Sequence, residues 1–263
     1  VSKKIADVDK YVVHYYMNDY EIDRETIVFI HGLWDDKDSF LKVAKYFKKD
    51  YNIILPDLQW HGENMRKTNL NYSIESQMKY LSTLLETIWT TKIHIAWNSM
   101  WWHISTAFTA NYPESVLSLT VINATGVIVE KPIYIGYDTF LSTKEDLEDS
   151  LWEVLYTIPY IPMPIAKYMI QQTNASRKFA NEHILPDMRA WKYIDLKSEI
   201  KDIKTKSLIL WWKHDEVVSF EVAEYYRVNL ENSELIIIDK ASHAPQIDRY
   251  EKIAELLENF IRK

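Results

Sequence analysis

Three polar residues with complementary chemistry, Ser99, Asp215 and His243, each lie shortly after a run of apolar residues. A serine hydroxyl becomes a strong nucleophile when a histidine takes its proton, and a carboxylate orients that histidine and stabilises its charged form. Such a set of residues attacks a carbonyl carbon and passes through an acyl-enzyme intermediate. The order Ser, Asp, His along the chain differs from the orders in trypsin-like and subtilisin-like proteases, which excludes both classes.

Ser99 stands between a predicted strand and a predicted helix, in the segment IHIAWNSMWWHIS at 93–105. A serine on a sharp strand-to-helix turn presents its hydroxyl above the sheet, as in a nucleophile elbow. Taken alone, the segment also fits a serine that caps a helix. Residues 31–33, His-Gly-Leu, follow another predicted strand, at the place where a hydrolase takes one of its oxyanion donors. Together, these strand-end segments predict a serine hydrolase.

The elements that must position these residues alternate between strands and helices. Runs of β-branched and apolar residues predict strands at 11–16, 26–30, 51–55, 93–96, 117–122, 207–211 and 235–238. Helical periodicity predicts helices between them, at 39–48, 74–88 and 250–261. This alternation predicts an α/β fold with a doubly wound, mostly parallel sheet. Ser99, Asp215 and His243 then lie at the carboxyl edge of the sheet, where open α/β sheets bind their ligands.

The alternation of strands and helices is interrupted between residues 127 and 196. This stretch contains helical segments at 144–155 and 164–182 and no clear strand. We therefore predict one core domain, formed by residues 1–126 and 197–263, with residues 127–196 as a helical cap or lid on the carboxyl edge of the sheet. An apolar lid over a nucleophile favours hydrophobic substrates, although packing of the lid on the sheet explains most of its apolar residues.

Composition limits the classes of function. The 263 residues are 26% charged and 47% hydrophobic, which is typical of a globular protein. A net charge of −7 without a basic block argues against nucleic-acid binding. The chain has no cysteine, which excludes disulfides, thiolate catalysis and cysteine-ligated metals. The predicted chemistry requires no metal or cofactor, and the sequence does not predict an oligomeric state.

No stretch approaches the roughly eighteen consecutive apolar residues of a membrane span, so we predict no integral membrane segment. An apolar lid would still allow transient contact with a lipid surface. The first residues are charged and lack an apolar core, so they are not a signal peptide, and the chain as written is predicted to be cytoplasmic. Because the chain begins with Val1 rather than Met, a removed upstream segment, such as a signal or an anchor, is compatible with the sequence.

The motifs together resemble the serine α/β-hydrolase family, in particular its monoacylglycerol lipases and esterases, over nearly the whole chain. The matching segments are HGLWDDKDSF at 31–40, DLQWHGEN at 57–64, IAWNSMWWHIS at 95–105, NATGV at 123–127, LWWKHDEVV at 210–218 and SHAPQIDR at 242–249. In these places the family usually reads HGFGD, DLPGHG, GNSMGG, WGKxD and GHxPxxE. The resemblance implies the α/β-hydrolase fold.

The same resemblance implies a role for each matching residue. Ser99 corresponds to the nucleophile, Asp215 to the acid and His243 to the base of the triad. The backbone N–H groups of Leu33 and Met100 correspond to the donors of the oxyanion hole. Dehalogenases and epoxide hydrolases of this fold carry Asp at the nucleophile position, so Ser99 excludes them. We interpret His31, His61 and Asp57 as residues that shape loops.

Glycine and tryptophan occur in abnormal numbers. A typical content of about 7% would give roughly eighteen glycines, but the chain has 4, together with 10 tryptophans. Tryptophan stands where the family commonly has glycine, at Trp34, Trp60, Trp97, Trp101, Trp102 and Trp212, and we expect the same of Trp89. When one residue type is replaced by a single other type at several motif positions, the pattern indicates that one codon is read as tryptophan here and as glycine in the native host. UGA is read as glycine in certain bacteria and as tryptophan in other codes, so we hypothesise that the native protein has glycine there.

The leading interpretation is a carboxylic-ester hydrolase acting on a monoacylglycerol or another small apolar ester. The alternative within the fold is a carbon–carbon bond hydrolase of the meta-cleavage-product type, which shares the NSM elbow. Those enzymes usually carry Trp soon after the catalytic histidine, whereas Ala244 and Pro245 follow His243 here. A third interpretation, a catalytically inactive binding scaffold, applies if the tryptophans at the motif positions are genuine.

Overall fold

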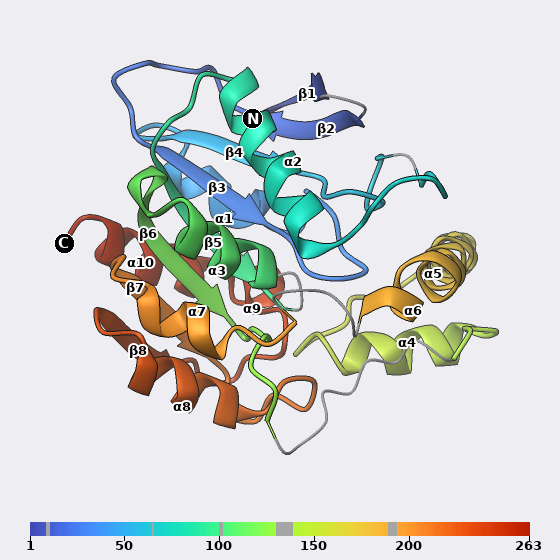
Figure 1. The fold of residues 1–263 in the computed structure, drawn as a ribbon. Coiled ribbons are helices and arrows are strands. Elements are labelled where there is room, and N and C mark those ends of the chain that lie inside the picture. Colours follow the sequence, from blue (N-terminus) through green and yellow to red (C-terminus); the bar gives the residue numbers. More distant parts are fainter. Residues whose placement is uncertain (9–10, 65, 100–101, 130–138, 189–193) are drawn as a thin grey trace.

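The computed structural model describes residues 1–8, 11–64, 66–99, 102–129, 139–188 and 194–263. In this part of the chain, one eight-stranded sheet has the strand order β1-β2-β4-β3-β5-β6-β7-β8 (Figure 1). The strands are β1 (Ser2–Val8), β2 (Tyr11–Met17), β3 (Thr26–Ile30), β4 (Asn52–Pro56), β5 (Ile93–Asn98), β6 (Val116–Ile122), β7 (Ser207–Trp211) and β8 (Ser233–Ile237). β2 pairs antiparallel with both β1 and β4, and every other neighbouring pair is parallel. The predicted α/β fold with a mostly parallel, doubly wound sheet is therefore confirmed.

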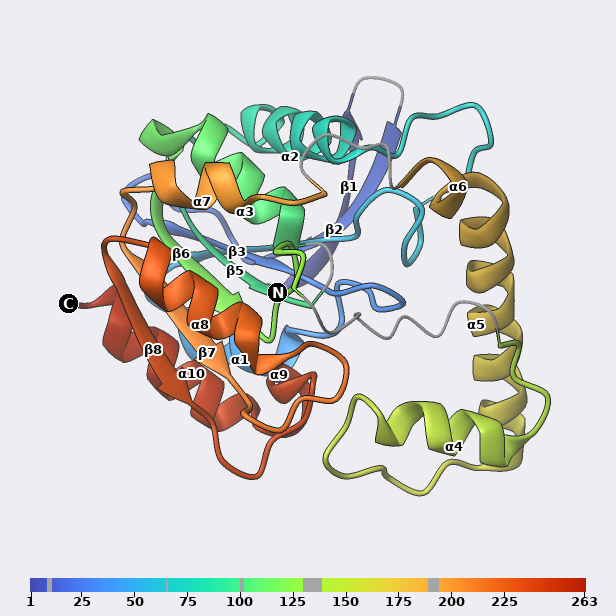
Figure 2. The same ribbon diagram turned by 60° about the horizontal axis from the view of Figure 1, so that its bottom comes forward.

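Helices cover both faces of the sheet (Figure 2). They are α1 (Leu41–Phe47), α2 (Ile74–Thr87), α3 (Trp102–Asn111), α7 (Lys197–Asp202), α8 (Phe220–Asn229), α9 (Pro245–Asp248) and α10 (Tyr250–Ile261), with a short 3-10 turn at Pro113–Ser115. Residues of α2, α3, α7 and α8 enter one apolar core, and residues of α1 and α10 enter the core on the opposite face. β3, β4, β5 and β7 are buried along their whole length. The apolar runs of β3, β4 and β7 follow from this double coverage.

β1 is the strand that the sequence analysis did not predict. Its sequence, SKKIADV, carries three charges, and only Val8 is buried. It pairs with β2 at the edge of the sheet, from Ser2 opposite Met17 to Val8 opposite Tyr11. A strand that buries almost no side chains shows no hydrophobic alternation, so its pairing depends on backbone hydrogen bonds that the sequence pattern does not reveal.

The chain between β6 and α7 forms a helical excursion with α4 (Lys144–Trp152), α5 (Met163–His183) and α6 (Leu185–Met188). α4 and α5 share a small apolar core of their own, made by Leu141, Leu147, Ile161 and Ala166. The excursion stands beyond the end to which β3 and β6 point (Figure 1). The N–H of Leu196 donates to the carbonyl of Gly126 at 2.8 Å, which joins the two ends of the predicted lid. The division into a core domain and a lid stays a prediction.

Three tryptophans among the described residues have a left-handed backbone: Trp34, with φ 64°, Trp60, with φ 60°, and Trp89, with φ 59°. In this region the Cβ of an L-residue approaches the following carbonyl oxygen, which costs about 1–2 kcal/mol per residue, whereas glycine has no Cβ and adopts it readily. All three are among the positions where we hypothesise glycine. A left-handed backbone at these positions is what the glycine hypothesis expects, and the hypothesis stays a prediction.

Trp89 shows the cause of this backbone conformation at the end of α2. Its N–H donates to the carbonyl of Glu86 at 3.1 Å, and the N–H of Thr90 donates to the carbonyl of Leu85 at 2.9 Å. Ile88 is the C-cap residue, so these two bonds form a Schellman motif with Trp89 at the left-handed position, where glycine is usual. The side chain of Trp89 is 86% exposed, so the fold gains little from its indole.

We expect Trp89→Gly to stabilise the protein, because it removes the left-handed strain without removing buried contacts. The expected gain in the free energy of unfolding is about 1 kcal/mol, which raises Tm by about 2–4 °C in a chain of this size. Trp152→Gly is the matched control, since Trp152 is also exposed but ends α4. Glycine in a helix costs about 0.5–1 kcal/mol, so this variant should melt at a lower temperature. Equal shifts in calorimetry for the two variants would contradict the strain argument.

Candidate active site

Ser99, His243 and Asp215 lie together at the carboxyl edge of the sheet. His243 Nε2 is 2.6 Å from Ser99 Oγ, and His243 Nδ1 is 2.7 Å from Asp215 Oδ2. All three residues are buried. Because β5, β7 and β8 run parallel, the loops that follow them meet at one edge of the sheet. The structure thus brings three residues from distant parts of the chain into one hydrogen-bonded line.

Ser99 occupies a strained turn directly after β5. Its φ is 67°, and its N–H donates to the carbonyl of Ile122 on the neighbouring strand at 3.2 Å. Gly32 packs against this turn so closely that a Cβ on it would lie 3.0 Å from Ser99 Cβ and 3.3 Å from the carbonyl oxygen of Asn98. The loop after β3 therefore requires glycine at this position to approach the serine.

Asp215 is held by backbone groups in the turn after β7. Its N–H donates to the carbonyl of Trp212 at 3.1 Å, which closes the turn. Asp215 Oδ1 accepts from the N–H groups of Val217 and Val218, at 2.8 and 3.0 Å. With Oδ1 fixed in this way, Oδ2 is the oxygen that faces His243.

The loop that carries Leu33 is fixed by His31. The N–H of Leu58 donates to His31 Nε2 at 3.1 Å, so the ring proton resides on Nδ1 and is donated to the carbonyl of Gly32 at 2.8 Å. The ring of His61 lies 5.0 Å from that of His31, and burial lowers the pKa of His61 well below its ordinary value. Both histidines thus connect the loops after β3 and β4. Leu33 stays a predicted oxyanion donor, and Met100 lies outside the described residues.

Asp57 anchors the loop after β4. Its Oδ2 pairs with Lys37 Nζ at 2.8 Å, and its two carboxylate oxygens accept from the backbone N–H groups of Lys37 and Glu63. Burial alone would lower the pKa of Lys37, but the hydrogen bonds to Asp57 and Glu63 raise it above its ordinary value. A Cβ on Gly62 would lie 2.3 Å from the carboxylate, so glycine is required beside this ion pair. The carboxylate of Asp57 serves the structure of the loop.

We expect Asp57→Ala to lower the free energy of unfolding by about 3–5 kcal/mol, because it leaves the buried ammonium of Lys37 without its main partner. Glu63→Gln is the matched control, since Glu63 binds the same ammonium at 2.8 Å but its side chain is 43% exposed. An exposed ion pair contributes less than about 1 kcal/mol. Urea unfolding of the two variants measures the difference. Similar losses would show that burial does not decide the contribution of this pair.

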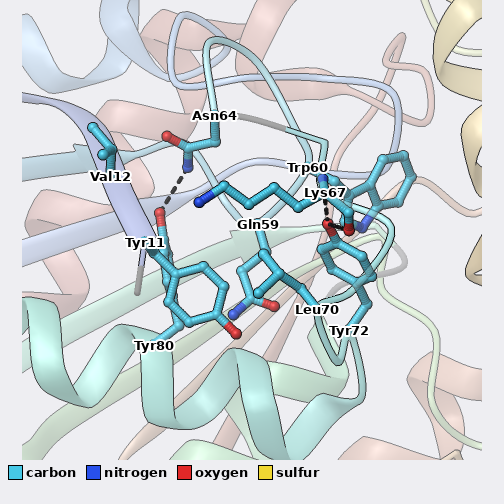
Figure 3. A pocket seen from close by; sticks show the side chains of 9 residues that line it. All are labelled: Tyr11, Val12, Gln59, Trp60, Asn64, Lys67, Leu70, Tyr72 and Tyr80. Carbon is cyan, nitrogen blue, oxygen red and sulfur yellow. Dashed lines mark hydrogen bonds between the residues drawn. The ribbon is translucent and has the colours of Figure 1, made fainter. Parts of the chain in front are cut away.

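A small pocket lies between β2, α2 and the loop after β4 (Figure 3). Its lining includes Tyr80 and Asn64, whose amide donates to the Tyr80 hydroxyl at 2.7 Å. The free space within it is about 10 Å³, room for about one water molecule. None of the three residues of the hydrogen-bonded line contributes to its lining. It is therefore too small to hold a substrate.

Two buried asparagines beside the site were not singled out by the sequence analysis. Asn98 is the last residue of β5, and Asn123 directly follows β6. Both donate side-chain N–H groups to the backbone carbonyl of His243. Both asparagines stand in segments that match the family, NSM at 98–100 and NATGV at 123–127, and these motifs were the available signal. The sequence does not reveal that both amides reach the same oxygen.

Comparison with known proteins places the chain in a family. It matches the profile described as alpha/beta hydrolase fold over residues 25–250. Lipase 1 of Psychrobacter immobilis is 25% identical over 262 residues, covering 97% of this chain and 81% of the relative. Monoacylglycerol lipase ABHD6 of Mus musculus is 22% identical over 254 residues, covering 90% and 75%. The crystal structure of a membrane phospholipase A, described as a bacterial virulence factor, superposes with a TM-score of 0.90 and 25% identity over 100% of this chain and 87% of that chain.

Among the described residues, no helix is long and apolar enough to cross a membrane. The family profile, the strand order and the strand-end position of Ser99 agree with one another. The chain belongs to the alpha/beta hydrolase fold family.

Proposed function

We propose that the protein is a carboxylic-ester hydrolase that forms an acyl-enzyme intermediate on Ser99. The observation that carries this proposal is the line from Asp215 through His243 to Ser99, with contacts of 2.7 and 2.6 Å. A histidine at this distance takes the proton of the serine hydroxyl, and the carboxylate stabilises the imidazolium that forms. The names of the three similar proteins, a lipase, a monoacylglycerol lipase and a phospholipase A, favour an apolar ester as the substrate.

The reaction proceeds in two steps of the same form. Ser99 Oγ attacks the ester carbonyl while His243 Nε2 takes its proton, and the imidazolium then gives that proton to the leaving alcohol. In the second step His243 Nε2 takes a proton from water, whose oxygen attacks the acyl carbonyl. The bond from the acyl carbon to Ser99 Oγ then breaks, the imidazolium returns its proton to Ser99 Oγ, and the carboxylic acid leaves. The N–H groups of Leu33 and Met100 are the proposed donors to the oxyanion in both steps, a contribution of about 3–4 kcal/mol for each donor.

The helical excursion is the proposed lid over this site. The N–H of Ala244, the residue after His243, donates to the carbonyl of Val154 at 3.0 Å, so the chain that follows α4 contacts the loop of the base. Large apolar side chains of this region are exposed, including Trp152, Tyr160 and Tyr168. These side chains support an apolar substrate and transient contact of the lid with a lipid surface.

Two substrate classes separate the candidate functions. The assay compares the hydrolysis of monoacylglycerols and p-nitrophenyl esters with that of a meta-cleavage product. It is run on the protein with the tryptophan-containing sequence and on a six-glycine variant. That variant carries glycine at 34, 60, 97, 101, 102 and 212. We expect ester turnover in the six-glycine variant and none of the carbon–carbon substrate. Faster cleavage of the meta-cleavage product would favour the alternative hydrolase, and no turnover by either form would favour an inactive scaffold.

A further inference from the structure

The backbone carbonyl of His243 accepts hydrogen bonds from two side-chain amides. Asn98 Nδ2 donates to it at 2.9 Å, and Asn123 Nδ2 donates to it at 3.1 Å. Asn98 is 2% exposed and Asn123 is fully buried. A carbonyl oxygen has two lone pairs, so these two amides satisfy it completely. The base residue is therefore held through its own backbone from two neighbouring strands.

Asn123 joins the base to the acid. Its Nδ2 also donates to the carbonyl of Ser242 at 2.8 Å, and its Oδ1 accepts from the N–H of Trp212 at 2.8 Å. The carbonyl of Trp212 in turn accepts from the N–H of Asp215. The side-chain amide of Asn123 thus links the loop of His243 to Trp212, the first residue of the Asp215 turn. The φ of Asn123 is 42°, in a region that asparagine adopts more readily than most residues.

Asn98 joins the base to the nucleophile. It directly precedes Ser99, and its Nδ2 also donates to the carbonyl of Ile122 at 3.1 Å. Its Oδ1 accepts from Gln246 Nε2 at 2.9 Å, and Gln246 is buried in α9, three residues after His243. The nucleophile turn and the base loop are therefore joined at two points, the carbonyl of His243 and the amide of Gln246.

On the basis of the proposed ester hydrolysis, we infer that Asn98 and Asn123 are positioning residues for His243. Asn98 fixes the distance from His243 Nε2 to Ser99 Oγ, and Asn123 fixes the distance from His243 Nδ1 to Asp215. A catalytic group displaced by about 1 Å loses on the order of 10²-fold in rate. The hydrogen bonds from Asn98 and Asn123 fix the backbone carbonyl of His243. The imidazole therefore stays at hydrogen-bond distance from both Ser99 and Asp215.

The test begins with Asn98→Ala and Asn123→Gly in the six-glycine variant, where position 212 keeps its backbone N–H. Glycine at 123 retains the left-handed backbone and removes only the amide. We expect kcat for p-nitrophenyl esters to fall by about 10–100-fold in each, with KM nearly unchanged. The substrate makes no contact with either amide in the proposed mechanism, so its binding is preserved.

Asn52→Gly is the matched control. Asn52 is also fully buried, and its Nδ2 donates to the carbonyls of Glu21 and Arg24 while its Oδ1 accepts from the N–H of Glu21. It has the same bonding pattern as Asn123 but begins β4, at the amino edge of the sheet. We expect Asn52→Gly to lower Tm and leave kcat within twofold of the reference. A fall in kcat equal to that of Asn123→Gly would overturn the proposal.

A second comparison separates positioning from general stability. In a His243→Ala background no imidazole remains to be positioned, so Asn123→Gly should change the residual rate by less than about twofold, because residues that act as a unit are not additive. An equal fold-loss in both backgrounds would overturn the proposal. A reference that hydrolyses esters with no dependence on His243 would instead refute the proposed function.

The proton between His243 Nδ1 and Asp215 provides a readout that does not depend on activity. We expect this proton to give a low-field resonance in proton NMR, which its loss in an Asp215→Asn protein would identify. We expect Asn123→Gly to shift or broaden this resonance, whereas Asn52→Gly leaves it unchanged. An unchanged resonance in Asn123→Gly would overturn the role of Asn123, whether or not the reference protein hydrolyses esters.

Discussion

Ser99→Ala is expected to abolish ester hydrolysis, with a loss in kcat of about four to six orders of magnitude. The substitution removes the oxygen that lies 2.6 Å from His243 Nε2, so no acyl-enzyme forms. His243 and Asp215 keep their mutual contact, and the fold loses only one hydroxyl. Release of p-nitrophenol from short and medium esters by the six-glycine variant, with and without Ser99→Ala, measures the effect.

Ser105→Ala is the control for this prediction. Ser105 is buried in α3, and its hydroxyl has no hydrogen-bond partner among the described residues. Its removal should leave both kcat and stability nearly unchanged. Covalent labelling by a fluorophosphonate should follow the same pattern, with label on Ser105→Ala and none on Ser99→Ala. Undiminished turnover by Ser99→Ala would show that the nucleophile has been assigned wrongly.

The sequence predicts the central strands of the fold well because burial controls their composition. The segments at 26–30 and 207–211 are buried on both faces, and their apolar runs coincide with β3 and β7. β1 is exposed along most of its length, so its sequence shows no alternation of apolar and polar residues that would predict a strand. Local sequence thus predicts elements whose side chains enter a core, and it misses elements held mainly by backbone pairing.

The same distinction applies to the site. The order and strand-end positions of Ser99, Asp215 and His243 predict that they meet, because parallel strands deliver their loops to one edge. Asn98 and Asn123 depend on the direction of single side chains across several loops, which only the tertiary structure shows. Motif spacing therefore predicts which residues share an edge, but not which polar groups orient them.

Native glycine at the motif tryptophans is the prediction with the largest effect on the whole protein. Left-handed φ values at Trp34, Trp60 and Trp89 together cost about 3–6 kcal/mol. The net stability of a domain is only about 5–15 kcal/mol. Trp97 adds a fully buried indole two residues before Ser99, where strand and helix approach closely. Overpacking of a core typically costs a further 1–3 kcal/mol. The printed chain should therefore express poorly or be inactive.

Glycine at the tryptophan positions around Ser99 should increase folding and activity. We expect Trp97→Gly, Trp101→Gly and Trp102→Gly, combined, to raise the yield of folded protein and the rate of ester hydrolysis. Trp211→Gly is the matched control, because the family itself has Trp at this position and the indole is fully buried in β7. Removing a buried Trp side chain typically costs about 3–5 kcal/mol, so this variant should lose stability.

Peptide mass spectrometry on protein from its native source decides the matter directly. The segment at 93–106 contains the three tryptophans closest to Ser99 in the sequence, and the fragment masses of its peptide distinguish glycine from tryptophan at each. We expect glycine at 97, 101 and 102, while peptides covering Trp211 retain tryptophan. Because both sets of peptides come from the same sample, tryptophan at Trp211 serves as the internal reference for glycine at the other three positions. Tryptophan at all three positions, in a native protein that still cleaves esters, would refute the recoding hypothesis and require the strand and helix beside Ser99 to accommodate these side chains.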